Sequence, residues 1–241
     1  MMSCILVFYL GVLSLTLQAA PDPDGLYARR DDIASARQAA GIWSRRLAGN
    51  PRDFEAAWKL ARAHYWLGGH GPQRERKGFF ETGVEAGRTA AALMPDKPEG
   101  HFWMAANMGG LAESFGMRQG LKYRGAIRDS LLTVLRLDAG YQQGSADRAL
   151  GRWYFKVPAL FGGDRRKSEI HLRQALTYNP NSIASRFFLA ETLLGLDRKA
   201  EAITELQRVR DTPPDPAWLP EDRDFQQQAL RLLVTLRQKR N

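Results

Sequence analysis

The amino-acid sequence predicts an all-α protein, a right-handed helical-repeat solenoid of about five antiparallel helix pairs. The first observation is that apolar and small residues recur three and four positions apart from residue 31 onward, which is the spacing of helix faces. The second is that prolines and glycines interrupt this pattern at intervals of one helix. The third is an internal repeat near the C-terminus, where four positions recur 34 residues later. The matched residues are Ser168 and Ala202, Leu172 and Leu206, Ala175 and Val209, and Pro180 and Pro214.

A period of 34 residues is the length of a tetratricopeptide repeat (TPR), a two-helix unit that buries its apolar face only by stacking on its neighbours. The register of the repeats is set by a pair of neighbouring residues that recurs once per repeat. Each pair is a large apolar residue followed by a small one, and it comes soon after the residue that ends the preceding helix. These pairs are Leu60-Ala61, Met104-Ala105, Leu150-Gly151 and Leu189-Ala190. Their spacing of 44, 46 and 39 residues indicates longer helices or turns in the first repeats. We therefore expect one TPR-like domain over residues 21–241.

The start of the chain has the features of a targeting segment. Residues 5–20 carry no charge, and the run is short for a membrane span. It ends in small residues, Ala19-Ala20, followed by Pro21, which is typical of a secretory signal peptide and its cleavage site. An uncleaved N-terminal anchor and a soluble terminal helix are the alternatives. We expect residues 1–20 to be the signal peptide, and the protein to be periplasmic or secreted, or anchored to the envelope by this segment.

The first half of the domain is a succession of helices set by apolar spacing and by the residues that end them. In chain order we expect helices over 31–50, over a stretch ending at 69, and over 78–94, 99–115, 122–137 and 146–157. The helix at 78–94 contains Gly83 and Gly87 among several alanines. Glycine inside a helix costs about 1 kcal/mol relative to alanine. Its use here predicts the close approach of a neighbouring helix.

The second half continues the pattern with a clear turn at each boundary. Residues 159–163 form a turn, and Asp164 is well placed to cap the helix that follows. Two further helices are separated at residues 179–181, and Gly195 and Asp197 form the next turn. The stretch 211–220 holds four prolines, so we expect an extended connector. The last helix, from about residue 222 to 239, is apolar on one face and polar on the other, as expected of a helix that caps a solenoid.

Composition limits the function. The chain has 35 Lys and Arg against 26 Asp and Glu, a net charge of +9, which suits an acidic partner, an anionic membrane surface or nucleic acid. Its basic residues are dispersed in pairs, which is typical of solvated helix faces, so we expect no nucleic-acid partner. The single cysteine, Cys4, excludes a disulfide framework and a cysteine-based metal site within one chain.

The sequence shows no pattern that would carry catalysis. The four histidines, His64, His70, His101 and His171, form no His-Glu-x-x-His motif. Gly162-Gly163-Asp164 lacks the residue order of a phosphate-binding loop and a preceding strand. We therefore expect a protein that is not an enzyme, with no catalytic, metal-binding or cofactor-binding residues.

The candidate binding site is the concave face, which the first helix of each pair lines in a TPR array. By the register above, the outward positions on these helices are Trp58, Arg62 and Tyr65, then Phe102, then Arg148, Arg152 and Phe155, and last Phe187 and Glu191. Arginine beside exposed aromatic surface suits a carboxylate or an acidic, partly apolar peptide. A merely solvated face is the alternative interpretation.

Residues 141–194 resemble the T component associated with TRAP transporters. A Gly-rich aromatic helix, a proline, a Gly-Gly-Asp turn and a helix containing Ala-Leu carry the resemblance, supported by Trp103-Met104-Ala105-Ala106 before Gly109-Gly110. The residues are Gly144, Leu150, Gly151, Pro158, Gly162, Gly163, Asp164, Lys167, His171, Ala175 and Leu176. The resemblance implies a secreted or lipid-anchored bacterial helical-repeat protein that binds a periplasmic solute receptor.

A second resemblance is to the regulator of microtubule dynamics family, which is also TPR-like. It is carried by Leu150-Gly151-Arg152-Trp153, by His101-x-Trp103 and by the acidic, proline-rich connector before the last helix. Together these features predict a non-catalytic exported scaffold that binds a protein or peptide partner in its concave groove. The partner implied by the first resemblance is a periplasmic solute-binding protein of a TRAP system. A general envelope interaction scaffold and an enzyme of unrecognised type are the alternatives, and self-association is left open.

Overall fold

The computed structural model describes residues 21–238, so the expected signal peptide or anchor at 1–20 lies outside the described residues. Within them the chain is helical, with short turns between the helices. The α-helices are α1 (Pro23–Ala28), α2 (Ile33–Gly49), α3 (Phe54–His70), α4 (Arg76–Leu93), α5 (Pro98–Ser114), α6 (Met117–Leu137), α7 (Tyr141–Lys156), α8 (Arg165–Tyr178), α9 (Ile183–Gly195), α10 (Lys199–Asp211) and α11 (Leu219–Gln238). Two 3-10 turns, η1 (Ala159–Phe161) and η2 (Pro216–Trp218), complete the described chain.

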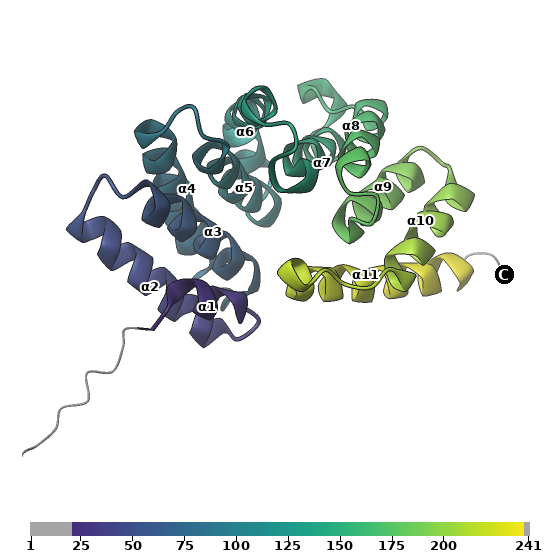
Figure 1. Ribbon diagram of the computed structural model, residues 1–241. Helices are drawn as coiled ribbons and strands as arrows, with labels where there is room; N and C mark the ends of the chain where they lie inside the picture. Colours follow the sequence, from purple (N-terminus) through teal and green to yellow (C-terminus); the bar gives the residue numbers. More distant parts are fainter. Residues whose placement is uncertain (1–20, 239–241) are drawn as a thin grey trace, which may run out of the picture.

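The helices stack as antiparallel hairpins. Helices α3 and α4, α5 and α6, α7 and α8, and α9 and α10 form four hairpins, preceded by α1 and α2 and followed by α11. Figure 1 shows that the hairpins form an arc and that α11 lies across its open side, with its first residues toward α1 and α3. The all-α, TPR-like stack predicted from the sequence is confirmed. No helix of the described chain is long and apolar enough to cross a membrane.

Short polar side chains begin several helices as the sequence indicates. The Asp164 carboxylate accepts hydrogen bonds from the backbone N–H groups of Arg166 and Lys167 at 2.8 and 3.1 Å. Asp32 caps α2 in the same way. Such caps satisfy N–H groups that have no partner within the helix. The predicted capping role of Asp164 is confirmed.

The small residues of α4 and α5 allow the two helices to touch backbone to backbone. A Cβ added to Gly87 would lie 2.7 Å from the backbone nitrogen of Met104, and one added to Gly100 would lie 2.3 Å from that of Ala91. No real Cβ fits at such distances. The close approach predicted from the glycines of the 78–94 helix is confirmed.

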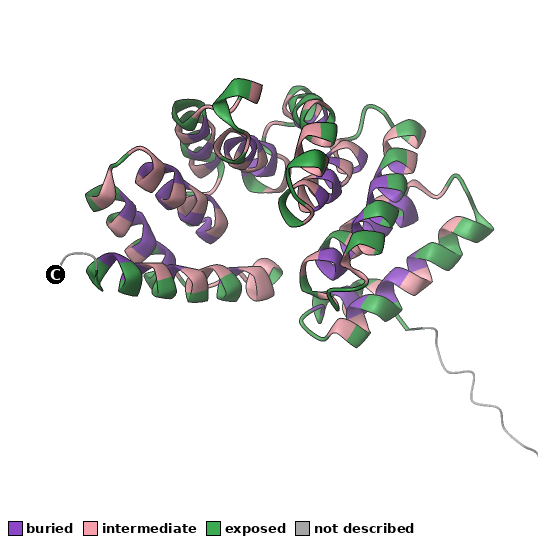
Figure 2. Ribbon diagram, turned by 180° about the vertical axis from the view of Figure 1, so that it is seen from behind, coloured by how far each residue is buried: buried purple, intermediate pink, exposed green. Residues whose placement is uncertain are grey.

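The buried residues lie on the helix faces that are turned toward neighbouring helices (Figure 2). One apolar cluster extends from Leu26 to Trp153 and another from Leu172 to Leu236. Leu172, Ala175 and Leu189, on which the repeat register depends, are fully buried. The fold therefore buries the stripe of each helix that the sequence pattern marks.

Helix α7 begins with an irregular turn. Gln142, Gln143 and Gly144 have φ values of 44°, 59° and 76°, in the left-handed region. A Cβ on Gly144 would lie 2.8 Å from the ring of Tyr178, so the end of α8 packs closely against this turn. Regular helix starts after it, which agrees with the predicted start at 146.

The connector before α11 differs from the extended segment that was predicted. Residues Pro216–Trp218 form a 3-10 turn, and α11 starts at Leu219 rather than at about 222. Pro220 falls in the first turn of this helix, where the missing N–H costs nothing because that group has no helical partner.

Candidate functional site on the concave face

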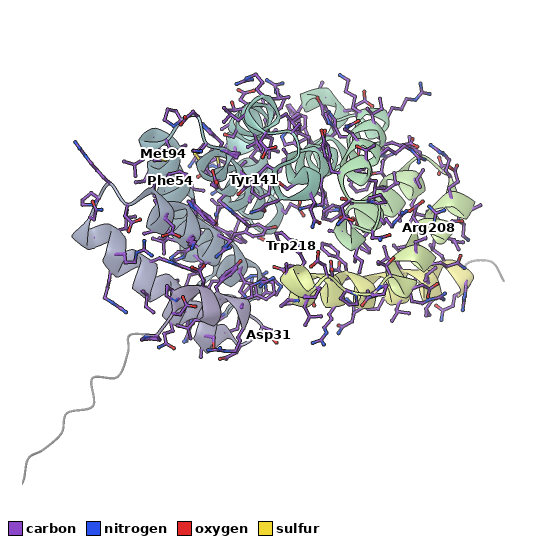
Figure 3. All side chains as sticks on the ribbon, in the orientation of Figure 1. Asp31, Phe54, Met94, Tyr141, Arg208 and Trp218 are labelled. Atoms are coloured by element: carbon purple, nitrogen blue, oxygen red, sulfur yellow. The ribbon has the colours of Figure 1, made fainter. Side chains whose placement is uncertain are left out.

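The predicted site residues lie on α3, α5, α7 and α9, the first helices of the four hairpins. These helices face α11 across the arc, and Figure 3 shows side chains of both turned toward one another, with Trp218 labelled beside the start of α11. The rings of Phe187 on α9 and Phe225 on α11 are 5.3 Å apart. The inner face of the arc is therefore partly covered by the chain itself.

Arg152 is held by two carboxylates from neighbouring helices. Its guanidinium donates to both oxygens of Glu113 at 3.1 Å and to Glu191 at 2.5 Å. It also lies 4.7 Å from the ring centroid of Phe188. Arg152 and Glu191, both predicted to face a partner, thus pair with each other. This network ties α5, α7 and α9 together and neutralises Arg152 within the protein.

Arg62 is embedded in aromatic side chains near the start of the domain. Its guanidinium carbon lies 4.1 Å from the ring centroid of Tyr27 and 5.0 Å from that of Trp58. One of its nitrogens lies 3.4 Å from a carboxylate oxygen of Asp24. Its Nε is buried with no hydrogen-bond partner among the described residues. Arg62 is therefore largely satisfied by stacking and by one long ion pair.

Arg148 differs from both of these arginines. It makes no hydrogen bond and no ion pair with any residue of the described chain. Its side chain is only partly exposed, and the protein around it removes enough water to lower its pKa. The nearest groups that offset this effect are Tyr65, Asp222 and Glu221. Arg148 is thus a partly exposed guanidinium on the inner face that has no hydrogen-bond or ion-pair partner within 21–238.

The aromatic residues divide into exposed and supporting ones. Tyr65 is 41 % exposed, with its ring 5.9 Å from that of Trp103. Phe102 and Phe187, expected to face a partner, are instead 7 % and 6 % exposed. Phe102 packs against the ring of Tyr141, and Phe187 packs against Phe225 of α11. Both rings therefore contact the protein itself rather than solvent. Phe155 is half-buried and reaches toward Gly195 at the end of α9.

Helix α11 closes the arc through contacts that sequence reasoning missed. Arg30, only 5 % exposed in its side chain, pairs with Glu221, its Nε donating to Oε1 at 2.9 Å and one terminal nitrogen donating to the Ala217 carbonyl at 3.0 Å. His70 lies 3.3 Å from a carboxylate oxygen of Asp224. Acidic residues at a helix start ordinarily complement the helix dipole and need no further explanation. Glu221, Asp222 and Asp224 cluster just after the proline-rich connector. This clustering is the sequence signal that could have identified the contact between α11 and the other end of the arc.

Asp222 lies between these contacts and is buried. Its carboxylate accepts a hydrogen bond from the backbone N–H of Asp215 at 2.9 Å. Burial, together with the charges of Asp215 and Glu221, raises the pKa of Asp222 to about 6. The folded protein therefore protonates Asp222 at a higher pH than the unfolded chain does.

The described chain offers no metal-binding alternative to the concave face. Among residues 21–238, no three His, Cys, Asp or Glu side chains are grouped so that they could hold a metal ion. A cavity of about 600 Å³ opens beside α10 and the connector, lined in part by Asn181, Thr204, Arg208 and Thr212. It is open to solvent and lies away from the concave residues.

Comparison with known proteins gives two family matches. A family model described as "TRAP transporter T-component" matches residues 96–237. A model described as "Regulator of microtubule dynamics protein 1-3" matches residues 26–161. Each covers more than half of the chain, and the two overlap in its centre. No curated protein matches the sequence.

Solved structures support the same architecture. The chain is similar to TTC0263, a thermophilic TPR protein of Thermus thermophilus, with a TM-score of 0.67 and 24% identity, over 88% of this chain and 97% of that one. It is also similar to MamA, with a TM-score of 0.53 and 14% identity, over 83% and 94% of the two chains. At such identities the likeness concerns the fold alone.

Proposed function

The chain belongs to the TRAP transporter T-component family and, over residues 26–161, to the regulator of microtubule dynamics family, and we propose that it is a non-catalytic scaffold that binds a partner protein through its concave face. The fold is of the TPR type, in which stacked hairpins leave one face of the array available for binding. We infer that the partner contributes a carboxylate to this face.

The observation that carries this proposal is the state of Arg148. Arg62 and Arg152 already have carboxylate partners within the protein, whereas Arg148 has none among the described residues. Water is partly removed from this guanidinium, and a bidentate carboxylate from a partner would give it the charged acceptor that it lacks. The exposed ring of Tyr65 lies close enough to Arg148 to influence it electrostatically and offers apolar contact area beside it.

The position of α11 restricts the form of the partner. Because α11 packs across α9 and its start is fixed to Arg30, we infer that a partner would reach the inner face along α3, α5 and α7. An acidic tail or loop suits this space better than the surface of a folded domain. The partner would then contact Trp58, Tyr65 and Arg148. Arg152 and Glu191 would instead position the helices.

The test uses a synthetic acidic peptide that contains one leucine and ends in a free carboxylate. Calorimetry with the Arg148→Gln variant should show affinity lower by about 10- to 100-fold, since a charge-assisted pair is worth roughly 1.5–3 kcal/mol. Added salt should weaken binding to the wild type because partly exposed pairs are screened. The matched control is Arg45→Gln, an exposed arginine on α2. Equal affinity in wild type and Arg148→Gln would remove the concave face from the proposal.

We further propose that the partner is a periplasmic solute-binding protein of a TRAP system and that the mature chain starts near Ala20 or Pro21. The family match supports the first point, and the uncharged run at residues 5–20 supports the second. Affinity capture from intact envelope with wild type and Arg148→Gln, followed by intact-mass measurement of the chain, tests both. A mass that includes Met1 would favour an anchor. Recovery of other envelope proteins without a solute receptor would favour a general scaffold, the interpretation that the match to regulators of microtubule dynamics supports.

A further inference from the structure

The net positive charge of the protein is concentrated in two short segments. Residues 117–128 and 156–167 together contain eight Lys and Arg and one Asp. The rest of the chain has 27 Lys and Arg against 25 Asp and Glu, and is therefore nearly balanced. The first segment is the start of α6, and the second runs through η1 into the start of α8.

Most cations of these segments lack a carboxylate partner. Many arginines elsewhere pair with a carboxylate, as Arg46, Arg88, Arg186 and Arg198 do. Of the eight cations only Arg128 makes an ion pair, with Asp129, among the described residues. The other seven are exposed and make no ion pair within the described chain: Arg118, Lys122, Arg124, Lys156, Arg165, Arg166 and Lys167.

The fold brings the two segments onto one outer shoulder. Helices α6 and α8 are the second helices of successive hairpins, so they run in the same direction, and they lie on the outside of the arc, away from α11 (Figure 1). The guanidinium of Arg124 lies 5.6 Å from the ring centroid of Phe161 in η1. The indole N–H of Trp153 donates to the carbonyl of Arg124 at 2.9 Å. The first contact places η1 against the first turns of α6, and the second joins α7 to the same part of α6.

Exposed apolar side chains stand among these cations. Leu160 at the tip of η1 is 88 % exposed, Met117 is 67 % exposed and Ile170 is 65 % exposed. The tip is held rigidly, because the N–H of Asp164 donates to the Tyr154 carbonyl at 2.9 Å and Gly163 passes so close to Val157 that no Cβ would fit. Leu160 is thus held outward by the backbone. Its exposure is a fixed feature of the fold.

We propose that this basic shoulder, formed by residues 117–128 and 156–167 together with Ile170, docks on an anionic phospholipid membrane. Unpaired cations attract anionic headgroups, each contributing about 1 kcal/mol near such a surface. Aliphatic side chains that project among the cations can enter the boundary between headgroups and acyl chains. An acidic protein would satisfy the cations, and it would need apolar side chains placed among its carboxylates to cover Leu160 and Met117. A bilayer interface accommodates both features at once.

This inference goes beyond the proposed function, because it concerns the outer face and none of the concave residues. Docking through α6 and α8 would leave the inner face turned away from the lipid. The same molecule could then hold a partner on one side and a membrane on the other. Failure of either proposal leaves the other intact.

The test is sedimentation of the full chain with vesicles of phosphatidylcholine alone and of phosphatidylcholine mixed with phosphatidylglycerol. The double variant Lys122→Glu with Arg166→Glu reverses two shoulder charges. Its matched control, Arg45→Glu with Arg52→Glu, makes the same change in net charge at two exposed arginines far from the shoulder that make no ion pair with the described residues. Leu160→Ser is compared with Val234→Ser, which changes a 52 % exposed residue on α11. Circular dichroism confirms that each variant is folded.

We expect the wild type to bind the mixed vesicles at least about tenfold more strongly than phosphatidylcholine alone. The shoulder double variant should lose roughly tenfold or more, and Leu160→Ser several-fold, while both controls stay within about twofold of wild type. Equal losses in the shoulder and control double variants would show a general charge effect and overturn the proposal. So would equal binding of all variants through the N-terminal segment. Binding to soluble polyglutamate without binding to mixed vesicles would also overturn it and would indicate an acidic protein on this face.

Discussion

At the scale of single residues, the structure sets apart groups that the sequence makes look alike. Asp222 is one of a run of acidic residues at the start of α11, yet it is 6 % exposed and accepts the backbone N–H of Asp215. Burial raises its pKa to about 6, well above the value of about 3.9 for a free aspartate. The folded protein therefore binds a proton at this site more tightly than the unfolded chain does.

The sign of the pH dependence follows from this difference. As pH falls from about 6 to about 4, Asp222 is protonated in the folded state and its contribution to the free energy of unfolding rises. Above pH 6 the ionised carboxylate costs roughly 2–3 kcal/mol. Asp222→Asn keeps an acceptor for the Asp215 N–H without the charge. We expect it to stabilise the protein by about that amount near pH 8 and to have little effect near pH 4.5.

Urea unfolding at both pH values measures the effect, with the exposed Asp31→Asn as the control. A stabilisation of the same size at both pH values would mean that the charge of Asp222 is not the cause. No stabilisation near pH 8 would mean that Arg148 compensates the carboxylate more fully than its burial suggests.

At the scale of elements, the contact between α4 and α5 shows how glycine positions two helices. Gly100 lies where the backbone of Ala90 and Ala91 passes, whereas no atom lies within 4 Å of the space that a Cβ on Gly109 would occupy. The two glycines stand in the same helix and differ only in what surrounds them. Their replacement by alanine should therefore have opposite effects.

Gly100→Ala should destabilise the protein by about 1–3 kcal/mol, because its Cβ would force α4 and α5 apart. Gly109→Ala should stabilise it by about 0.5–1 kcal/mol, since alanine has less backbone entropy to lose. The midpoints of denaturant unfolding measure both changes. A stabilisation shared by the two variants would show that helix propensity, rather than the close approach, governs this pair.

At the scale of the whole molecule, α11 turns an open arc into a closed one. Arg30 and Glu221 are 191 positions apart in the sequence. Arg30 is also 5.0 Å from the ring centroid of Tyr27, and its carbonyl accepts the indole N–H of Trp66. The start of α11 thus docks into a preformed site at the other end of the arc, next to Arg148.

Glu221→Gln should open this contact. Removing one partner of a largely buried pair leaves Arg30 desolvated, and we expect a loss of about 3 kcal/mol. Amide hydrogen exchange in residues 219–226 should accelerate, and solution scattering should show a larger radius of gyration. The control is Glu85→Gln, which breaks an exposed pair with Arg88 on α4 and should change stability by less than about 1 kcal/mol. Unchanged exchange at the start of α11 would show that the ion pair does not hold the arc closed.

The sequence by itself determined the helices, their order and the faces they bury. Leu60-Ala61 and Leu189-Ala190 mark the register, and all four residues are buried. Proline and glycine positions placed most boundaries within a few residues. This information is local, because the helical period and the chemistry of caps and turns depend on neighbours three or four positions away.

Only the tertiary structure decided which concave residues are available. Arg62, Arg148 and Arg152 share one pattern in the sequence, but Asp24 reaches the first, and Glu113 and Glu191 reach the last from positions 39 residues away. The return of α11 across the arc depends on how each hairpin is rotated against the next. Small rotations between hairpins add up along a solenoid and set its curvature. The contacts between distant helices depend on that curvature, which no local sequence pattern encodes.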